Sequence, residues 1–207
     1  MTAVKVCGIT TVEAAAAARD TGADLIGFVF APSRRRLAPA AARDIMRALG
    51  RPRPLLVGVF VDAGSDGIEE VAQFCSLDLV QLHGDAPPAL CSALSRPVIR
   101  ALPVRAGTLE REAALYRGVA AYLLFDSPHP AQAGGTGRVA DWSLAAEAAS
   151  SHDTILAGGL DAHNVVTAIA AVRPWGVDAS SGLETNGAKD PLKIAAFVSA
   201  AKGVTCK

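Results

Sequence analysis

Four side chains that can exchange protons or bind a charged ligand each stand at the end of a short apolar run. They are Cys7, His83, Asp126 and Asp178. A thiolate can act as a general base and a protonated carboxyl as a general acid. In a closed barrel of parallel strands every strand ends at the same mouth, where activity lies, so the four converge only if the barrel closes. On its position alone, Cys7 is more simply explained as a small buried apolar residue than as a catalytic group.

Glycine-rich segments follow the last three apolar runs and indicate a phosphate site. Backbone N–H groups exposed at glycines, together with serine hydroxyls, can bind a dianionic phosphate. The loops after strands seven and eight commonly form that site in βα barrels. A single glycine cluster is more simply explained as a turn. Three clusters at the same edge of the barrel favour a phosphate-binding site. The residues are Gly134, Gly135, Gly137, Gly158, Gly159, Ser180, Ser181 and Gly182.

A run of three arginines, Arg34 to Arg36, follows the second apolar run. A planar guanidinium can hold a carboxylate through two parallel hydrogen bonds. Such a run is usually a solvated basic loop, but its place at the predicted mouth favours an anion contact by at least one arginine. Phosphate at one side and carboxylate at the other would define an elongated, doubly anionic ligand.

The elements that must position these residues alternate along the chain. Eight apolar runs alternate with amphipathic or alanine-rich segments, which predicts a parallel sheet with helices outside it. Eight such units close into a (βα)8 TIM barrel. A doubly wound open sheet is the alternative, but its glycine fingerprint is missing after the first strand. The predicted strands cover residues 4–7, 24–30, 55–61, 78–83, 97–102, 121–125, 154–157 and 176–179, and the predicted helices cover 14–18, 40–49, 66–74, 88–94, 109–116, 142–150, 162–172 and 191–201.

Length and composition fit a single α/β domain over residues 1–207 with compact loops. Because 20 basic residues balance 20 acidic ones, neither a nucleic-acid partner nor a membrane surface is expected. Without a signal-peptide pattern or an apolar stretch of bilayer length, we expect a cytoplasmic protein. The cysteines show neither paired nor metal-ligand spacing, which predicts reduced thiols and no metal site. They are Cys7, Cys75, Cys91 and Cys206.

The motifs of the chain resemble, in order, those of phosphoribosylanthranilate isomerases. They include V-K-V-C-G-I-T at 4–10, S-R-R-R-L at 33–37, V-Q-L-H-G at 80–84, L-L-F-D at 123–126 and V-D-A-S-S-G-L-E at 177–184. The resemblance implies conversion of N-(5-phosphoribosyl)anthranilate to 1-(2-carboxyphenylamino)-1-deoxyribulose 5-phosphate. This Amadori rearrangement belongs to tryptophan biosynthesis and needs neither metal nor organic cofactor. The partner would be a small phosphosugar substrate, and the enzyme a monomer or a homodimer.

The resemblance also implies a role for each matching residue. Cys7 would be the general base and Asp126 the general acid. Arg35 would hold the anthranilate carboxylate, although Arg36 could share or take that role. The substrate-contacting residues would be His83 and Asp178, and the phosphate site would comprise Gly158, Gly159, Ser180, Ser181 and Gly182.

These groups can carry out the rearrangement in two proton transfers. Asp126, kept protonated by burial, can donate to the ribose ring oxygen and open the ring to an iminium. Cys7 as thiolate can then remove the proton on the neighbouring carbon, giving an enamine that tautomerises to the ketone. The N-terminus of the following helix would lower the thiol pKa. Lys5, which shares a strand face with Cys7, could add positive potential or merely fill a polar interior.

Three other functions fit parts of the pattern. The related isomerase of histidine biosynthesis, or a dual-substrate version of it, has a longer chain and an aspartate where this chain has Cys7. A non-catalytic phosphosugar-binding barrel would tolerate the loss of either acid–base partner, yet Cys7 and Asp126 are both present. A redox role for the thiols would call for a C-x-x-C pair, which the chain lacks.

Overall fold

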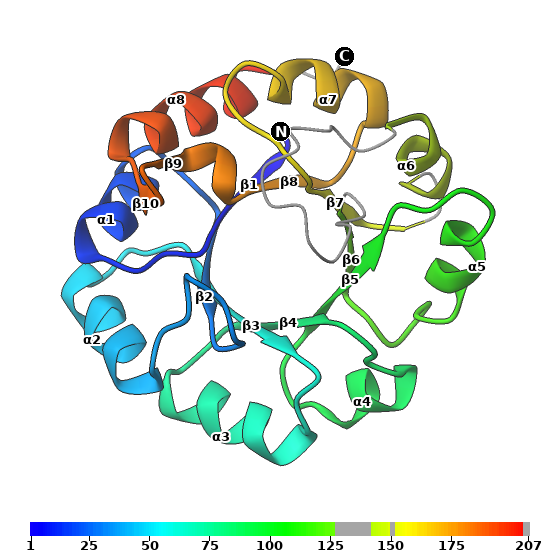
Figure 1. The fold of residues 1–207 in the computed structure, drawn as a ribbon, viewed down its shortest axis with the longest axis horizontal. Coiled ribbons are helices and arrows are strands. Elements are labelled where there is room, and N and C mark those ends of the chain that lie inside the picture. Colours follow the sequence, from blue (N-terminus) through cyan, green and yellow to red (C-terminus); the bar gives the residue numbers. More distant parts are fainter. Residues whose placement is uncertain (127–141, 150–151, 205–207) are drawn as a thin grey trace.

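The computed structural model describes residues 1–126, 142–149 and 152–204. Eight parallel strands follow one another around a closed barrel, and the last pairs with the first (Figure 1). The predicted (βα)8 barrel is therefore confirmed over an open sheet, which would have two free edges. The strands are β1 (Ala3–Cys7), β2 (Leu25–Val29), β3 (Leu55–Val61), β4 (Leu79–His83), β5 (Val98–Pro103), β6 (Tyr122–Asp126), β7 (Thr154–Leu156) and β8 (Gly176–Ala179).

Helices form the outer ring of the barrel (Figure 1). Local signals start several of them: the Thr11 side chain accepts a hydrogen bond from Ala14 N at the first helix, and prolines stand in the first turn of three others. The helices are α1 (Val12–Asp20), α2 (Pro39–Leu49), α3 (Ser65–Phe74), α4 (Pro88–Ala93), α5 (Leu109–Ala114), α6 (Trp142–Ala149), α7 (Val165–Val172) and α8 (Pro191–Lys202).

Alternation along the strands separates two layers of side chains. Residues that point outward pack against the helices in the main apolar core. Residues that point inward form a second apolar cluster, which includes Leu25, Leu79 and Ile99. Two charged side chains, Lys5 and Asp178, are buried at inward positions of β1 and β8. The interior of the barrel is therefore apolar in one layer and polar in another.

A short hairpin after β8 is absent from the sequence-based prediction. The 3-10 helix η1 (Ser181–Leu183) leads into β9 (Glu184–Thr185), which pairs antiparallel with β10 (Ala188–Lys189). The turn residues Asn186 and Gly187 have positive φ of 52° and 81°. A tight hairpin turn of this kind favours the Asn-Gly pair. The register places Glu184 directly opposite Lys189.

Some sequence-based expectations fall on parts of the chain outside the described residues. They are the glycine cluster at 134–137 and the last cysteine, Cys206. Within the described segments, no helix combines the length and the apolar character that a membrane crossing requires.

Candidate active site

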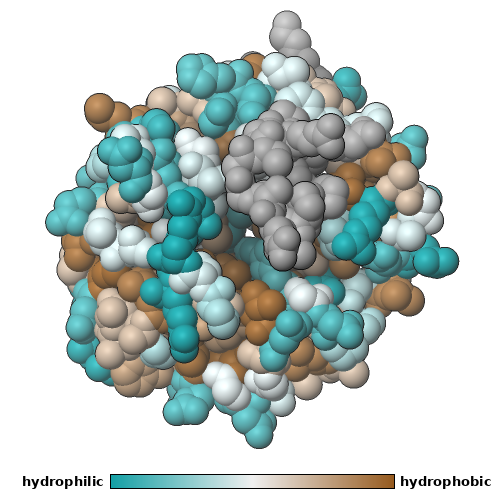
Figure 2. Space-filling view, viewed as in Figure 1, coloured by the Kyte–Doolittle hydropathy of each residue, from teal (hydrophilic) through white to brown (hydrophobic). Residues whose placement is uncertain are grey.

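The strand ends surround a cavity of about 810 Å³. Figure 2 shows the corresponding hollow at the centre of the ring. A second cavity of about 460 Å³ adjoins it and shares two of its lining residues, His83 and Asp126. Closure of the barrel thus brings together residues that lie far apart in the sequence. The predicted residues that line the larger cavity are Cys7, Arg35, His83, Asp126, Gly158, Gly159, Asp178, Ser180 and Ser181.

Two predicted residues, Arg36 and Gly182, do not line this cavity. Arg36 is exposed, and its backbone bridges to Val29 at the end of β2. Gly182 instead lets two loops approach each other, since a Cβ built there would lie 2.2 Å from the carbonyl oxygen of Leu160. Its role in the structure is therefore the spacing between the loops after β7 and β8.

Cys7, the last residue of β1, is only 7% exposed. Burial is the largest influence on its thiol and raises the pKa, and the Asp178 carboxylate raises it further. The ammonium groups of Lys5 and Lys189 oppose this increase without outweighing it. The expectation of a lowered thiol pKa is therefore wrong for this geometry, because the loss of water around Cys7 is the larger effect.

Lys5 and Asp178 form an ion pair inside the barrel, with 3.0 Å between Lys5 Nζ and Asp178 Oδ1. Their side chains are 0% and 9% exposed. Burial opposes the charge on Lys5, but Asp178 and the sulfur of Cys7 outweigh it, so the pKa of Lys5 is raised above its ordinary value. Asp178 thus reaches the cavity wall as predicted, with one carboxylate oxygen held by the lysine.

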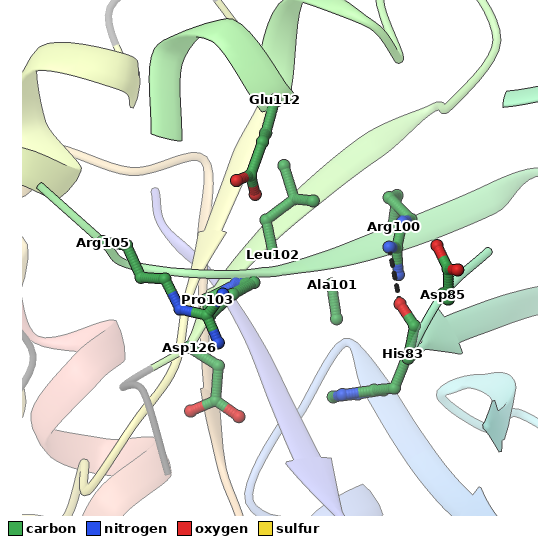
Figure 3. Close-up of a pocket in the computed structure, with 10 residues that line it drawn as sticks. His83, Asp85, Arg100, Ala101, Leu102, Pro103, Arg105, Glu112 and Asp126 are labelled. Atoms are coloured by element: carbon green, nitrogen blue, oxygen red, sulfur yellow. Dashed lines mark hydrogen bonds between the residues drawn. The ribbon is translucent and has the colours of Figure 1, made fainter. Parts of the chain in front are cut away.

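His83 and Asp126 end two strands of the same wall. Both side chains project from the strand ends to the same side of β5 (Figure 3). The backbone of Asp126 is fixed by a hydrogen bond of 2.8 Å that its carbonyl oxygen accepts from Val104 N. The ring nitrogen Nε2 of His83 lies 2.6 Å from Nε2 of Gln81, which is buried inside the barrel. Gln81 is a cavity residue that the sequence analysis did not single out.

Arg100 anchors the backbone on both sides of His83. Its guanidinium donates to the carbonyl oxygens of Leu82 at 3.1 Å and Gly84 at 2.8 Å, and it lies over the ring of Tyr116. Figure 3 shows Arg100 beside His83.

Arg100 is only 5% exposed and occupies an outward position of β5, since its neighbours Ile99 and Ala101 belong to the inward cluster. It lines the smaller cavity and not the larger one. Its signal in the sequence is a single arginine within an otherwise apolar strand.

Four charged residues at the strand ends form what we call the rim cluster: Arg34, Arg35, Glu184 and Lys189. Arg35 donates from Nε and Nη2 to the two carboxylate oxygens of Glu184, at 2.5 and 3.1 Å. Arg34 and Lys189 also donate to this carboxylate. Burial tends to raise the pKa of Glu184, but Arg35 and Lys189 outweigh it, so the pKa lies below its usual value. Burial lowers the pKa of Lys189 despite the nearby Glu184.

The rim cluster determines which edge of Arg35 is available to a ligand. Glu184 occupies the Nε side, whereas Nη1 makes no hydrogen bond with any described residue. The Arg35 side chain lies across the end of β1, because a Cβ on Gly8 would lie 2.5 Å from Arg35 Cδ and 3.4 Å from its Nε. The φ of Gly8 is +77°, a conformation that glycine adopts without strain. Arg35 can therefore present its Nη1 side to an anion near Cys7.

The loops after β7 and β8 form another part of the cavity wall. Gly158 and Gly159 turn sharply, with φ of 92° and 68°, and Asn164 Nδ2 donates to the carbonyl oxygen of Gly159 at 2.9 Å. Ser180 Oγ donates to the carbonyl oxygen of Cys7 at 3.1 Å. Lys189 Nζ donates to the carbonyl oxygen of Ser180 at 2.9 Å. The predicted phosphate loop is thus hydrogen-bonded to β1 and to the rim cluster.

Metal ligation has no support in the part of the chain that the structure describes. No group of three or more His, Cys, Asp or Glu side chains there could hold a metal ion. The donors around the cavity are instead arranged as ion pairs, as in Lys5–Asp178 and Arg35–Glu184.

Known proteins resemble the chain over its whole length. The family model described as N-(5'phosphoribosyl)anthranilate (PRA) isomerase matches residues 4–200. An N-(5'-phosphoribosyl)anthranilate isomerase from Desulforudis audaxviator (strain MP104C) is 49% identical over 203 residues, which cover 98% of each chain. The crystal structure of phosphoribosyl anthranilate isomerase from Thermotoga maritima is 39% identical with a TM-score of 0.90, covering 99% of this chain and 100% of that chain.

A further solved structure connects the fold to a ligand. It is described as phosphoribosyl anthranilate isomerase in complex with reduced 1-(o-carboxyphenylamino)-1-deoxyribulose 5-phosphate, and it is 38% identical with a TM-score of 0.86. The match covers 99% of this chain and 100% of that chain. With a family model spanning residues 4–200 and relatives matched from end to end, this chain belongs to the N-(5'-phosphoribosyl)anthranilate isomerase family.

Proposed function

We propose that Cys7 and Asp126 are the base and the acid with which this isomerase rearranges its substrate. The enzyme converts N-(5-phosphoribosyl)anthranilate to 1-(2-carboxyphenylamino)-1-deoxyribulose 5-phosphate, a step of tryptophan biosynthesis. One observation carries the assignment of roles: both side chains line a single cavity although they come from the non-adjacent strands β1 and β6. One sugar held between them can therefore meet an acid and a base.

The reaction begins with two proton transfers within the cavity and ends with a tautomerisation. Asp126 gives its proton to the ribose ring oxygen as the bond between that oxygen and C1 breaks, and the nitrogen lone pair forms the iminium. The Cys7 thiolate then takes the proton from C2, and the electrons of the C–H bond form the C1–C2 double bond. The resulting enamine gains a proton at C1 as the C2 hydroxyl loses one, which gives the ketone. Proton exchange restores Cys7 and Asp126.

The remaining cavity residues hold the two anionic ends of the substrate. Arg35 binds the anthranilate carboxylate with its Nη1 side, which Glu184 leaves available. The backbone of the loops after β7 and β8 binds the phosphate together with the serine hydroxyls. His83 and Asp178 contact the sugar between these ends. The phosphate-binding residues are Gly158, Gly159, Ser180 and Ser181.

The catalytic unit is a single barrel domain over residues 1–207 that acts in the cytoplasm on a small phosphosugar. The rearrangement is redox-neutral, and the proposed mechanism uses neither a metal nor an organic cofactor. The unit works as a monomer or as a homodimer, and analytical ultracentrifugation distinguishes the two.

The experiment that tests the function follows anthranilate-type fluorescence on freshly made phosphoribosylanthranilate. We expect rapid loss of fluorescence with the wild-type enzyme. The aminoimidazole substrate of the histidine-pathway isomerase, run in parallel, should turn over poorly, since Cys7 stands where that enzyme has an aspartate. Preferential turnover of the aminoimidazole substrate would contradict the proposal.

A further inference from the structure

We propose that Lys5 is a positioning residue that controls the ionisation of Cys7 from inside the barrel, and that Asp178 holds it there. For its effect on turnover, the inference rests on the proposed role of Cys7 as the base. The ionisation of Cys7 can be measured without that assumption. The three residues form a unit at the junction of β1 and β8, where Lys5 and Asp178 stand directly opposite each other in the strand register.

Lys5 is among the largest fully buried side chains of the described part of the protein, with 0% exposure. Removing an ammonium group from water carries a large free-energy cost, which a single ion pair often fails to repay. An apolar side chain would fill this inward position of β1 at a lower cost. Packing therefore does not explain a charge at this position.

The heads of Lys5 and Cys7 converge on one point of the neighbouring strand. A Cβ built on Gly27 of β2 would lie 2.9 Å from Cys7 Sγ and 3.2 Å from Lys5 Nζ. Both atoms therefore occupy the space in which any other residue would carry its side chain. The missing side chain of Gly27 lets the sulfur and the ammonium group approach each other inside the barrel.

The charged groups that act on Cys7 come from three strands. They are Lys5 on β1, Asp178 on β8 and Lys189 on β10. Lys5 lowers the pKa of Cys7 more than Lys189 does, whereas burial and Asp178 raise it. Lys5 itself stays charged, because Asp178 and Cys7 raise its pKa despite its burial. Lys5 is thus the principal cation that offsets a thiolate at Cys7.

This arrangement predicts opposite effects for the two partners. Without Lys5, a thiolate at Cys7 would face the Asp178 carboxylate with only Lys189 to offset it, so Cys7 would ionise at higher pH. With Asn in place of Asp178, an amide oxygen still accepts from Lys5 while the carboxylate that opposes a thiolate at Cys7 is gone, so Cys7 would ionise at lower pH. A residue that only filled space would shift ionisation in neither direction.

The test measures alkylation of Cys7 by iodoacetamide as a function of pH, with the Cys7 peptide quantified by mass spectrometry. Only the thiolate reacts, so the midpoint of the profile reports ionisation of that one cysteine. We expect Lys5→Met to raise the midpoint by at least about one pH unit, a roughly tenfold slower reaction at neutral pH. Asp178→Asn should lower it. Lys189→Met is the matched control, with a smaller increase than Lys5→Met.

A second comparison keeps the test valid if Lys5→Met fails to fold. The double variant Lys5→Met/Asp178→Asn leaves no unpaired carboxylate, and its midpoint is compared with that of Asp178→Asn alone. The inference requires a higher midpoint in the double variant. Equal midpoints would overturn it, as would a Lys5→Met profile equal to that of the wild type.

The pH dependence of kcat/KM separates this inference from the proposed function. If Lys5→Met shifts both the alkylation midpoint and the ascending limb of kcat/KM, both stand. If the midpoint shifts and the limb does not, Lys5 controls Cys7 as inferred, but Cys7 is not the base. A third outcome is that Lys5→Met shifts neither the alkylation midpoint nor the ascending limb of kcat/KM, while the two coincide in the wild type. Cys7 would then remain the base, and the inference about Lys5 would be wrong.

Discussion

Two groups of charged side chains flank the cavity at different depths. Lys5 and Asp178 lie inside the barrel, and their side chains are at most 9% exposed. The rim cluster lies at the strand ends, where the Arg34 side chain is 58% exposed while the Glu184 side chain is only 5% exposed. The inner group pairs one cation with one anion, whereas the rim cluster places three cations around a single carboxylate.

The inner pair and the rim cluster differ in net charge, and this difference indicates how each can contribute to the reaction. The inner pair has no excess charge to offer a ligand, but it lies beside Cys7 and acts on a proton. The rim cluster retains an excess of positive charge, which attracts an anion to the mouth and leaves one side of Arg35 available for binding it. We therefore expect changes near the inner pair to affect kcat and changes in the rim cluster to affect KM.

The largest effect should come from Asp126→Asn, which removes the acid while keeping the shape of the side chain. We expect kcat to fall by about 10²–10⁴-fold, the range for a positioned acid, with KM changed by less than about threefold. Asp85→Asn is the matched control, because this aspartate lines the adjoining cavity together with Asp126. Steady-state fluorescence kinetics measure kcat and KM of both variants. An equal loss of kcat in Asp85→Asn would contradict the assignment of Asp126 as the acid.

Breaking the inner pair should cost more stability than any change at the rim. We expect Lys5→Met to lower the free energy of unfolding by about 3–5 kcal/mol, since it leaves a buried carboxylate unpaired. Removing the second charge, as in Lys5→Met/Asp178→Asn, should recover part of that loss. Chemical denaturation measures both. A double variant less stable than Lys5→Met would show that the pair is held by something other than mutual charge compensation.

A smaller effect, confined to binding, should follow changes in the arginine loop. Arg35→Ala removes the guanidinium that faces the cavity, and we expect KM to rise by about 10–100-fold with kcat within about threefold. Arg36→Ala should leave both parameters unchanged, because Arg36 is exposed and outside the cavity lining. The reverse pattern would assign the carboxylate to Arg36.

The smallest expected effect is a pH-dependent contribution of Glu184 to stability. Because its folded-state pKa is lowered, Glu184 stabilises the fold above its unfolded pKa of about 4.3, and this contribution is lost as pH falls through the folded value. At pH 7, Glu184→Gln should therefore cost about 1.5 kcal/mol, the lower end of the range for hydrogen bonds to charged groups. At pH 3 the cost should shrink. Urea unfolding at the two pH values checks this, and a constant difference would contradict the assignment of the shift to the rim cluster.

The sequence predicts the barrel well, because strand and helix patterns alternate strictly and each strand end can be located. The positions of Cys7, His83, Asp126 and Asp178 at the mouth follow from that alternation together with barrel closure. The pairing of Lys5 with Asp178 depends on the register between the first and last strands, which sequence periodicity does not specify. This ion pair therefore emerges only with the closed barrel.

The rim cluster depends on a hairpin that has a local signal in the sequence. Asn186-Gly187 is a strong hairpin signal, and the hairpin is what places Glu184 and Lys189 beside Arg35. The direction of the Cys7 pKa could not be predicted in the same way. It results from competition between burial and three charged groups, and the outcome depends on how completely water is excluded.

The role of Cys7 as the base is tested most directly by mixing excess Cys7→Ser enzyme with phosphoribosylanthranilate and following fluorescence through a single turnover. We expect a binding phase like that of the wild type, since the anion-binding residues of the cavity are intact. Conversion should then be slower than in the wild type by about 10²–10⁴-fold. Conversion at the wild-type rate would contradict the assignment of Cys7 as the base.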